Sequence, residues 1–451
     1  MPSAVQMLAA QALAPVALDA ALAAQAKALL LDSLGCMLGG VASAPATAAR
    51  AAAAAMGGTP ECTAPGLGRT SAPLAVLANG TALRFLDAND YLFGRDPAHP
   101  SGVVPVALAC AERGGLSGRA LLEALVAAYE VHLRLAVHAG APNLWGRGFH
   151  HSTNLGFAAA ACAARLLGLD VDQAAHAMAI AGTHAVTLAQ LQSGGIANIK
   201  ASAEAYTAKT GLEAALLAQA GITGPAAILE GPYGWVKAVA GEADLAAITA
   251  PFGAPWLLSQ VCIKPYAAVA TAMAPVQAAL DLHAQGVRAE AVEAVTVKLP
   301  RFPLGTPSAA PDRRFPLTRE SADHSFWYCV CIALLEGACS EAQFDMARLA
   351  DPGLRRLLER TELEEDAAMT ARWPAAGGGV QVRLADGRVL ECRHEWPPGH
   401  PRNPLSPRVL EAKFHGFADP VLGHARAVAL VEAVWALEEC ADSRDLMELL
   451  A

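Results

Sequence analysis

The stretch "APFGAPWLLSQVCIKPY", residues 250–266, separates two parts of the chain that differ in pattern. Before it, apolar residues recur at helical spacing, as in "SGRALLEALVAAYEVHLRLAVHAG" (117–140). After it, alternating runs indicate strands: "VEAVTVKLP" (292–300) and "GVQVRLADGRVLECRHEW" (379–396), the latter with an Asp-Gly hairpin turn. The end of the quoted stretch, "SQVCIKPY" (259–266), also has the pattern of a strand. The sequence therefore predicts a helical domain followed by an α+β domain.

The predicted fold class is mainly α, with a large all-helical domain and a smaller α+β lid domain. No strand alternation interrupts residues 1–255, which disfavours doubly wound and barrel folds. The proline-rich connector "WPPGHPRNPLSP" (396–407) ends the α+β part, and the apolar helical tail after it is too short to stand alone. We expect residues 406–451 to complete the helical domain, making it discontinuous, and residues 256–405 to form the lid.

The bulk composition is that of a folded protein with a large core. The chain has 451 residues, 54% hydrophobic and 17% charged, which suits two domains and disfavours disorder. Its net charge of −9, without a Lys/Arg run, argues against nucleic acid as a partner. Charged residues interrupt the apolar runs before about 18 positions accumulate. With no basic start before the apolar N-terminus, we expect no membrane association and a cytoplasmic location.

The 10 cysteines are scattered and form neither a Cys-x-x-Cys pair nor a metal-like Cys/His spacing. Most lie in apolar runs, so we interpret them as small core residues in a reducing compartment. The sequence accordingly predicts no metal site.

A polar segment, "LDANDYLFGRDPAHPSG" (86–102), interrupts the apolar helical half. His99 stands directly before an apolar helix, and the N–H groups at a helix N-terminus favour anions. Asp87 and Asp90 lie upstream, and a carboxylate beside a histidine fixes its tautomer and raises its basicity. The segment predicts a histidine that nearby acids orient at the wall of a carboxylate pocket. The alternative is an Asp-rich helix end followed by a surface histidine.

Two more segments of the helical half carry candidate groups. His150 and His151 lie in the Gly-flanked connector "GRGFHHSTNLG" (146–156). Lys200 opens a long helix, where a lysine is electrostatically unfavourable unless an anion compensates its charge. The alternatives are solvated loop histidines and an exposed lysine that pairs with Glu204 one turn later.

The second domain adds Lys264, at the end of the expected strand 259–266, and "DHSFWYCV" (323–330), which begins a helix with His324 and Tyr328. Each fits an ordinary structural position as well, a solvated lysine or a core aromatic. Together, the histidines, lysines and tyrosine, without a metal motif, nucleotide loop or serine elbow, indicate proton transfer on a small polyanion.

The segments "HPSG" (99–102), "GFHHSTNLG" (148–156), "GLEAALLAQAGITGP" (211–225) and "DHSFWY" (323–328), in this order, resemble the MmgE/PrpD family over nearly the whole chain. Its members include 2-methylcitrate dehydratase, cis-aconitate decarboxylase and iminodisuccinate epimerase. The resemblance implies a helical domain with an α+β lid, usually in a homodimer. It also implies an active site in the cleft between the domains, without a metal or an organic cofactor.

The candidate site residues fall into two groups when the chain is matched to the family. The expected catalytic residues are His99, His150, Lys200, Lys264 and Tyr328. The residues expected to bind or orient the substrate are Asp87, Asp90, Tyr91, His151 and His324. His150 is preferred over its neighbour for catalysis because it matches the histidine of the family's Gly-Phe-His motif.

This sequence also departs from the family pattern. Val269 stands where the cis-aconitate decarboxylases carry a histidine, Met273 occupies a second common histidine position, and Ala201 replaces a frequent arginine. These departures imply a pocket less cationic than one built for a tricarboxylate, which weighs against decarboxylation of cis-aconitate.

The expected activity is that of a cofactor-independent lyase, a hydro-lyase similar to 2-methylcitrate dehydratase. It would abstract a proton next to a carboxylate of a small polycarboxylic acid, with lysines stabilising the carbanion-like charge and histidines moving the proton. The alternatives are an epimerase of an imino- or amino-linked dicarboxylate, a cis-aconitate-type decarboxylase and an inactive carboxylate-binding paralogue. The sequence leaves open the substrate, the stereochemistry and which histidine is acid or base.

Overall fold

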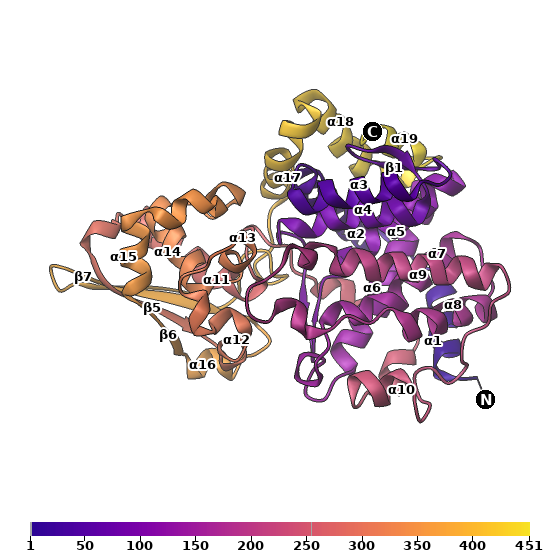
Figure 1. Ribbon diagram of the computed structural model, residues 1–451, viewed down its shortest axis with the longest axis horizontal. Coiled ribbons are helices and arrows are strands. Elements are labelled where there is room, and N and C mark those ends of the chain that lie inside the picture. Colours follow the sequence, from indigo (N-terminus) through magenta and orange to yellow (C-terminus); the bar gives the residue numbers. More distant parts are fainter. Residues whose placement is uncertain (1, 254) are drawn as a thin grey trace.

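The computed structural model describes residues 2–253 and 255–451. It is 60% helical with 10% strand, which confirms the predicted mainly α fold class. Figure 1 shows a large helical body beside a smaller lid that contains a sheet.

The N-terminal half forms most of the helical body. Its helices are α1 (Ala4–Leu13), α2 (Ala20–Gly40), α3 (Ala44–Met56), α4 (Ala72–Phe85), α5 (Val104–Gly114), α6 (Gly118–His138), α7 (Leu155–Leu166), α8 (Val171–His184), α9 (Ala203–Gln219) and α10 (Leu245–Thr249). Two short antiparallel hairpins interrupt them: β1 (Cys62–Ala64) with β2 (Gly68–Thr70), and β3 (Leu92–Phe93) with β4 (Pro97–Ala98). The prediction of an all-helical half missed these hairpins because strands of two or three residues are too short to show alternation.

The helices begin and pack as their sequences dictate. The side chains of Asp19 and Ser117 accept hydrogen bonds from backbone N–H groups in the first turns of α2 and α6, which satisfies donors that a helix start leaves free. Small residues then let the helices approach closely. A Cβ atom on Gly211 of α9 would lie 2.5 Å from the Cβ of Ala159 in α7. The alanine-rich composition is therefore a packing requirement, since larger side chains would separate these helices.

Helix α2 is long and apolar enough to span a membrane by length and composition, but it lies within the protein core. Its apolar window is 72% buried inside the protein. Helix α4 packs against it, and Leu30, Leu31 and Leu34 are fully buried. The apolar character of α2 thus serves the core of the helical body.

The lid is built around one mixed sheet with the strand order β6-β5-β7-β8. The strands are β5 (Val292–Leu299), β6 (Thr361–Glu365), β7 (Gly378–Leu384) and β8 (Val389–His394), and only the pair β5–β6 is parallel. The lid helices are α11 (Met273–Ala284), α12 (Arg301–Leu304), α13 (Arg319–Ala322), α14 (Phe326–Glu336), α15 (Pro352–Glu359) and α16 (Ala367–Thr370). The alternation of apolar and polar residues predicted β5, β7 and β8. It did not predict β6, "TELEE", because most residues of this strand are charged.

The segment 259–266 is not the strand that its pattern indicated. A 3-10 turn covers Leu257–Gln260, and the only ladder contact described for the segment is an isolated antiparallel bridge between Cys262 and Tyr91. The bridge nevertheless matters for the site, because it fixes the chain two residues before Lys264 against the polar segment 86–102.

The C-terminal helices α17 (Pro407–Leu422), α18 (His424–Trp435) and α19 (Arg444–Glu448) lie on the helical body rather than on the lid (Figure 1). Helix α17 packs against α2 so closely that a Cβ atom on Gly35 would lie 3.1 Å from the ring of Phe414. Beside this ring, Lys413 pairs with the buried carboxylate of Asp32. The tail thus contributes both apolar contacts and a buried ion pair to the body.

Replacing Phe414 with alanine should therefore destabilise the helical body. Phe414 is 1% exposed, and removing a buried phenylalanine ring costs about 3–5 kcal/mol of unfolding free energy. The loss would be measured by urea denaturation. Val409→Ala, at an exposed position of the same helix, is the control and should change the unfolding free energy by less than about 0.5 kcal/mol. Equal effects of the two substitutions would show that α17 adds little to the body.

Candidate active site

A cavity of about 340 Å³ lies where the helical body meets the lid. Both domains contribute polar and charged side chains to its wall. From the body come Arg84, Asp87, Asp96, His99, Asn143, His151 and Gln192, and the lid with the segment leading into it adds Lys264, Thr271, Arg301, Ser308, Arg313 and His324. This volume suits a small molecule, and the charged lining suits an anion.

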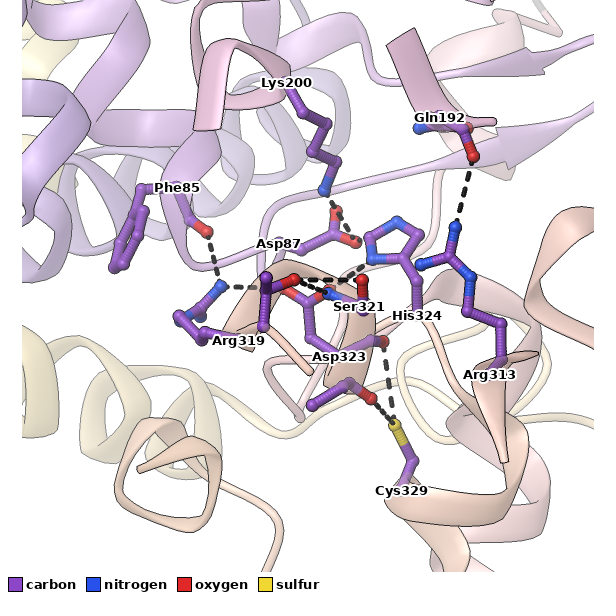
Figure 2. A network of polar contacts seen from close by, with 12 residues as sticks. Phe85, Asp87, Gln192, Lys200, Arg313, Arg319, Ser321, Asp323, His324 and Cys329 are labelled. Atoms are coloured by element: carbon purple, nitrogen blue, oxygen red, sulfur yellow. Dashed lines mark hydrogen bonds and ion pairs between the residues drawn. The ribbon is translucent and has the colours of Figure 1, made fainter. Parts of the chain in front are cut away.

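Asp87 is the electrostatic centre of this wall. Its carboxylate lies 2.8 Å from Arg84, 3.0 Å from Lys264, 3.1 Å from His324 and 3.4 Å from Lys200 (Figure 2 shows the last two contacts). Burial alone raises the pKa of Asp87, but the two lysines and Arg84 outweigh burial and hold that pKa well below its usual range. Asp87 also has a φ of +50°, a left-handed conformation that is uncommon outside glycine and that clusters at functional sites.

Lys264 combines full burial with an incompletely used ammonium group. Its Nζ donates to the backbone carbonyl of Asp87 at 2.8 Å and to the carboxylate at 3.0 Å. An ammonium has three N–H donors, so one remains for the cavity that Lys264 lines. Burial lowers the pKa of Lys264 to about 8, although the Asp87 charge opposes this shift. Lys264 can therefore stabilise negative charge and also exchange a proton near neutral pH.

His99 lines the cavity as an oriented, neutral imidazole. It precedes the 3-10 turn Pro100–Val103, and its Nδ1 lies 2.6 Å from the backbone carbonyl oxygen of Asp90. Because a carbonyl only accepts, we assign the proton to Nδ1, which leaves a lone pair on Nε2. Burial, together with the charges of Arg84 and Lys264, holds the pKa of His99 well below its usual range. His99 thus has the form required of a general base.

The acids of the polar segment 86–102 were predicted to orient His99 through their carboxylates, but the contact comes from a backbone carbonyl. Asp90 orients His99 through its backbone, while its carboxylate accepts from the Ser101 N–H at 3.1 Å and the Tyr129 hydroxyl at 2.9 Å. Burial raises the pKa of Asp90 to about 7. Tyr91 is buried and anchors the segment through its bridge to Cys262, but it does not line the cavity. Asp90 and Tyr91 thus hold the cavity-lining segments in position without lining the cavity themselves.

The structure places His151, not His150, at the cavity. The His151 ring lies 5.2 Å from the His99 ring and 3.8 Å from the His150 ring, measured between centroids. Its Nε2 is 3.4 Å from the carboxylate of Glu204. His150 turns into the body, where its Nδ1 accepts from the backbone N–H of Ser152 at 3.3 Å. The preference for His150 as the catalytic member of the pair is therefore not supported by its position.

Lys200 is buried behind Asp87 and does not line the cavity. It lies in the 3-10 turn Asn198–Ser202 that leads into α9, 4% exposed. The expected alternative, an exposed lysine paired with Glu204, is wrong, because Glu204 instead receives the guanidinium of Arg84 at 2.8 Å. Lys200 acts on the site through the charge of Asp87.

Tyr328, like His150 and Lys200, is an expected catalytic residue that does not line the cavity. It packs in the lid core, and its hydroxyl donates to the backbone carbonyl of Gln343 at 2.6 Å. Two other residues of the same motif do serve the site. His324 reaches across to Asp87 while its other nitrogen contacts Asp323 (Figure 2), and Ser325 donates to the backbone carbonyl of Arg313 at 2.6 Å.

Sequence reasoning missed several charged residues of the site. Arg84 sits in the last turn of α4, a position where a cation is expected for helix stability alone. Asp96 lines the cavity, and burial raises its pKa to about 7. Arg301 begins the short helix α12 and Arg313 ends a 3-10 turn, and neither lies in a recognisable motif. Their presence makes the cavity more cationic than the sequence departures implied.

Beside the cavity, two sets of side chains have donor atoms close enough to share a metal ion: His99 with His151 and Glu204, and Asp87 with Asp323 and His324. The surrounding charges fit a cation poorly. Arg84 contacts both Glu204 and Asp87, and Lys264 and Lys200 already compensate Asp87. A divalent ion at either position would meet buried positive charge, so the donor sets favour an anionic ligand.

The fold and the cavity define a two-domain, mainly helical protein with a cavity lined by charged residues between the helical body and an α+β lid. The chain matches the MmgE/PrpD N-terminal domain over residues 9–247 and the MmgE/PrpD C-terminal domain over residues 266–438. It therefore belongs to the MmgE/PrpD family.

Several characterised relatives resemble most of the chain. Human cis-aconitate decarboxylase is 30% identical over 392 residues, covering 83% of this chain and 79% of the relative. The 2-methylcitrate dehydratase of Cupriavidus necator is 27% identical over 346 residues, with 72% and 70% covered. The enzyme of the same name from Salmonella typhimurium is 26% identical over 359 residues, with 74% and 72% covered. These relatives are lyases, which supports an enzyme of this class.

Asp87→Asn should impair both stability and turnover. The substitution removes the shared counter-charge of Arg84, Lys200 and Lys264, and leaving buried charges uncompensated costs about 3–5 kcal/mol of unfolding free energy. Turnover should fall by roughly 100-fold or more because Lys264 loses its fixed position. Urea denaturation and steady-state kinetics measure the two effects. The control is Asp386→Asn, in the exposed β7–β8 turn, and unchanged turnover in the Asp87 variant would contradict the assignment.

Proposed function

We propose that this protein is a cofactor-independent hydro-lyase that eliminates water from a small hydroxylated polycarboxylic acid. The observation that carries the proposal is the pairing of an oriented neutral imidazole, His99, with a buried ammonium, Lys264, on the wall of one cavity. A dehydratase similar in action to 2-methylcitrate dehydratase needs this combination, a base for the C–H proton and a cation for the charge that develops.

The first step assigned to the site is proton abstraction next to a carboxylate. Nε2 of His99 takes the proton, and the electron pair left on carbon delocalises into the carboxylate oxygens. Lys264 lies on the same cavity wall with one N–H free, so it can donate to these oxygens as their charge grows. Burial strengthens this interaction because little water competes for the charge.

The second step needs a proton for the departing hydroxyl group. Two cavity residues have pKa values near neutrality, Lys264 at about 8 and Asp96 at about 7. One carboxylate oxygen of Asp96 accepts a hydrogen bond from the N–H of Leu144. The other oxygen has no hydrogen-bond partner among the described residues. Loss of the hydroxyl as water then forms the carbon–carbon double bond.

Decarboxylation is the second candidate, because human cis-aconitate decarboxylase is among the relatives. Lys264 could stabilise the carbanion that remains when carbon dioxide leaves and, with a pKa of about 8, also protonate it. Against this candidate stands Val269, an apolar cavity residue at the position where the family resemblance implies a histidine in the decarboxylases.

Proton and carbon-13 NMR in D2O, with a panel of hydroxylated and unsaturated di- and tricarboxylates, separate the candidates. We expect an alkene signal to appear as a hydroxylated acid is consumed. Bicarbonate formed from an unsaturated tricarboxylate would identify a decarboxylase, and deuterium incorporation without net loss of water would identify an epimerase. No change with any acid would leave an inactive carboxylate-binding protein.

The same assay tests the residues. His99→Gln and Lys264→Met should each lower turnover by roughly 100- to 1,000-fold. His184→Gln, at an exposed position on α8, is the matched control and should retain wild-type turnover. Full activity in either cavity variant would remove that residue from the mechanism.

The pH dependence of kcat/KM should show a plateau that ends at about pH 8. Lysine is cationic below its pKa, so the required charge on Lys264 is lost as the pH rises through about 8. His99 must be neutral, and because its pKa lies well below 6.5 the acidic limb should lie below that pH. Initial rates across this range measure both limbs. A rate that keeps rising more than one unit above pH 8 would show that Lys264 is not needed as a cation.

A further inference from the structure

Arg313 differs from the other cations of the cavity wall in its surroundings. Arg84 contacts Asp87 and Glu204, Lys264 contacts Asp87, and Arg301 contacts Glu365. Within residues 2–253 and 255–451, Arg313 has no carboxylate within ion-pair distance. It is therefore the cationic wall residue whose charge the protein itself leaves uncompensated.

The burial of Arg313 makes this lack of a counter-charge significant. The residue is 2% exposed, and only one of its terminal nitrogens is engaged. That nitrogen, Nη2, donates to the backbone carbonyls of Gly194 at 2.6 Å and Gln192 at 3.3 Å (Figure 2 shows the contact with Gln192). Nε and Nη1 have no acceptor among the described residues. A guanidinium remains charged in proteins, and a buried charge without partners is costly.

The backbone around Arg313 is fixed, so the orientation of the side chain is built into the fold. Arg313 ends the 3-10 turn Pro311–Arg313, and its carbonyl accepts from the hydroxyl of Ser325. Ser325 also caps α14, because it accepts from the N–H of Tyr328. The guanidinium is thereby held between the lid and the 192–194 segment of the body, with its free N–H groups beside the cavity.

We propose that Arg313 binds a carboxylate of the substrate and so sets the specificity for acids that carry this group. The inference rests on the proposed function, since it assumes a polycarboxylate in the cavity. The substrate carboxylate supplies the missing counter-charge and accepts from Nη1 or Nε. Because Nη2 holds the body loop at the same time, this carboxylate is recognised only when the lid lies against the body. Arg313 binds substrate and takes no part in proton transfer.

Calorimetric binding of three non-hydroxylated acids tests this role without turnover. The probes are tricarballylate, glutarate, which lacks its central carboxylate, and 2-methylsuccinate, which lacks a terminal one. We expect Arg313→Gln to weaken tricarballylate binding roughly 10- to 100-fold, the effect of one charge-assisted hydrogen bond. The variant should also lose the preference of the wild type for tricarballylate over one of the two diacids.

Comparison variants separate recognition from folding. Arg314→Gln removes the neighbouring arginine, which pairs with Glu362, and should bind all three acids as the wild type does. Arg313→Lys keeps the charge and should bind tricarballylate with intermediate affinity. In turnover assays Arg313→Gln should raise KM more than it lowers kcat.

Two results would overturn the role of Arg313, and only one of them would also contradict the proposed function. If Arg313→Gln binds the three acids with the relative affinities of the wild type, Arg313 only fastens the lid to the body, and the proposed function stands. If the wild type binds none of the acids, the polycarboxylate function fails together with the role of Arg313.

Discussion

The carboxylate of Asp87 is the shared counter-ion on which the arrangement of the site depends. Arg84 and Lys200 approach it from the helical body, Lys264 from the segment that joins the domains, and His324 from the lid. None of these groups would be stable when buried alone, since isolated charges in a protein interior are strongly disfavoured. One acid therefore joins the lid to the body through His324 and also holds the ammonium group of Lys264 in place. The left-handed backbone at Asp87 is the conformational cost of presenting that acid.

Burial in this charge cluster separates the acid and base functions of the site. It holds His99 in the neutral form, which can accept a proton. It also lowers the pKa of Lys264 to about 8, so that Lys264 is cationic at pH 7 and can still release its proton. It also raises the pKa of Asp96 to about 7. Burial thus moves the pKa values of a lysine and an aspartic acid toward neutrality from opposite sides, which is how protein side chains carry out acid–base chemistry near pH 7.

Predictions from the sequence were correct for elements that depend on local residue pattern. They were wrong or incomplete where contacts between residues distant in the chain determine the structure. Helical periodicity identified the mainly α class, and the alternation in 379–396 identified the β7–β8 hairpin. The charged strand β6 was missed because pairing with β5, not its own pattern, makes it a strand. In the site, residue types pointed to His99 and Lys264, but not to the fact that Asp90 contacts His99 through its carbonyl. Tyr328 fitted a motif, yet its hydroxyl is taken up by Gln343 within the lid.

The two domains contribute different kinds of residue to the cavity, which suggests how the fold can change substrates. The body supplies most of the titratable groups of the cavity wall, His99, His151 and Asp96 among them, on segments anchored in its core. The lid supplies Arg301, Arg313 and small neutral residues from short helices, 3-10 turns and the loops that join them, where substitutions disturb little packing. A change in the lid would therefore alter which carboxylates or apolar groups fit while the proton chemistry of the body is retained. Lys264 lies at the junction of the two domains, so in the proposed mechanism the position of the lid governs both recognition of the substrate and the charge that stabilises the reaction.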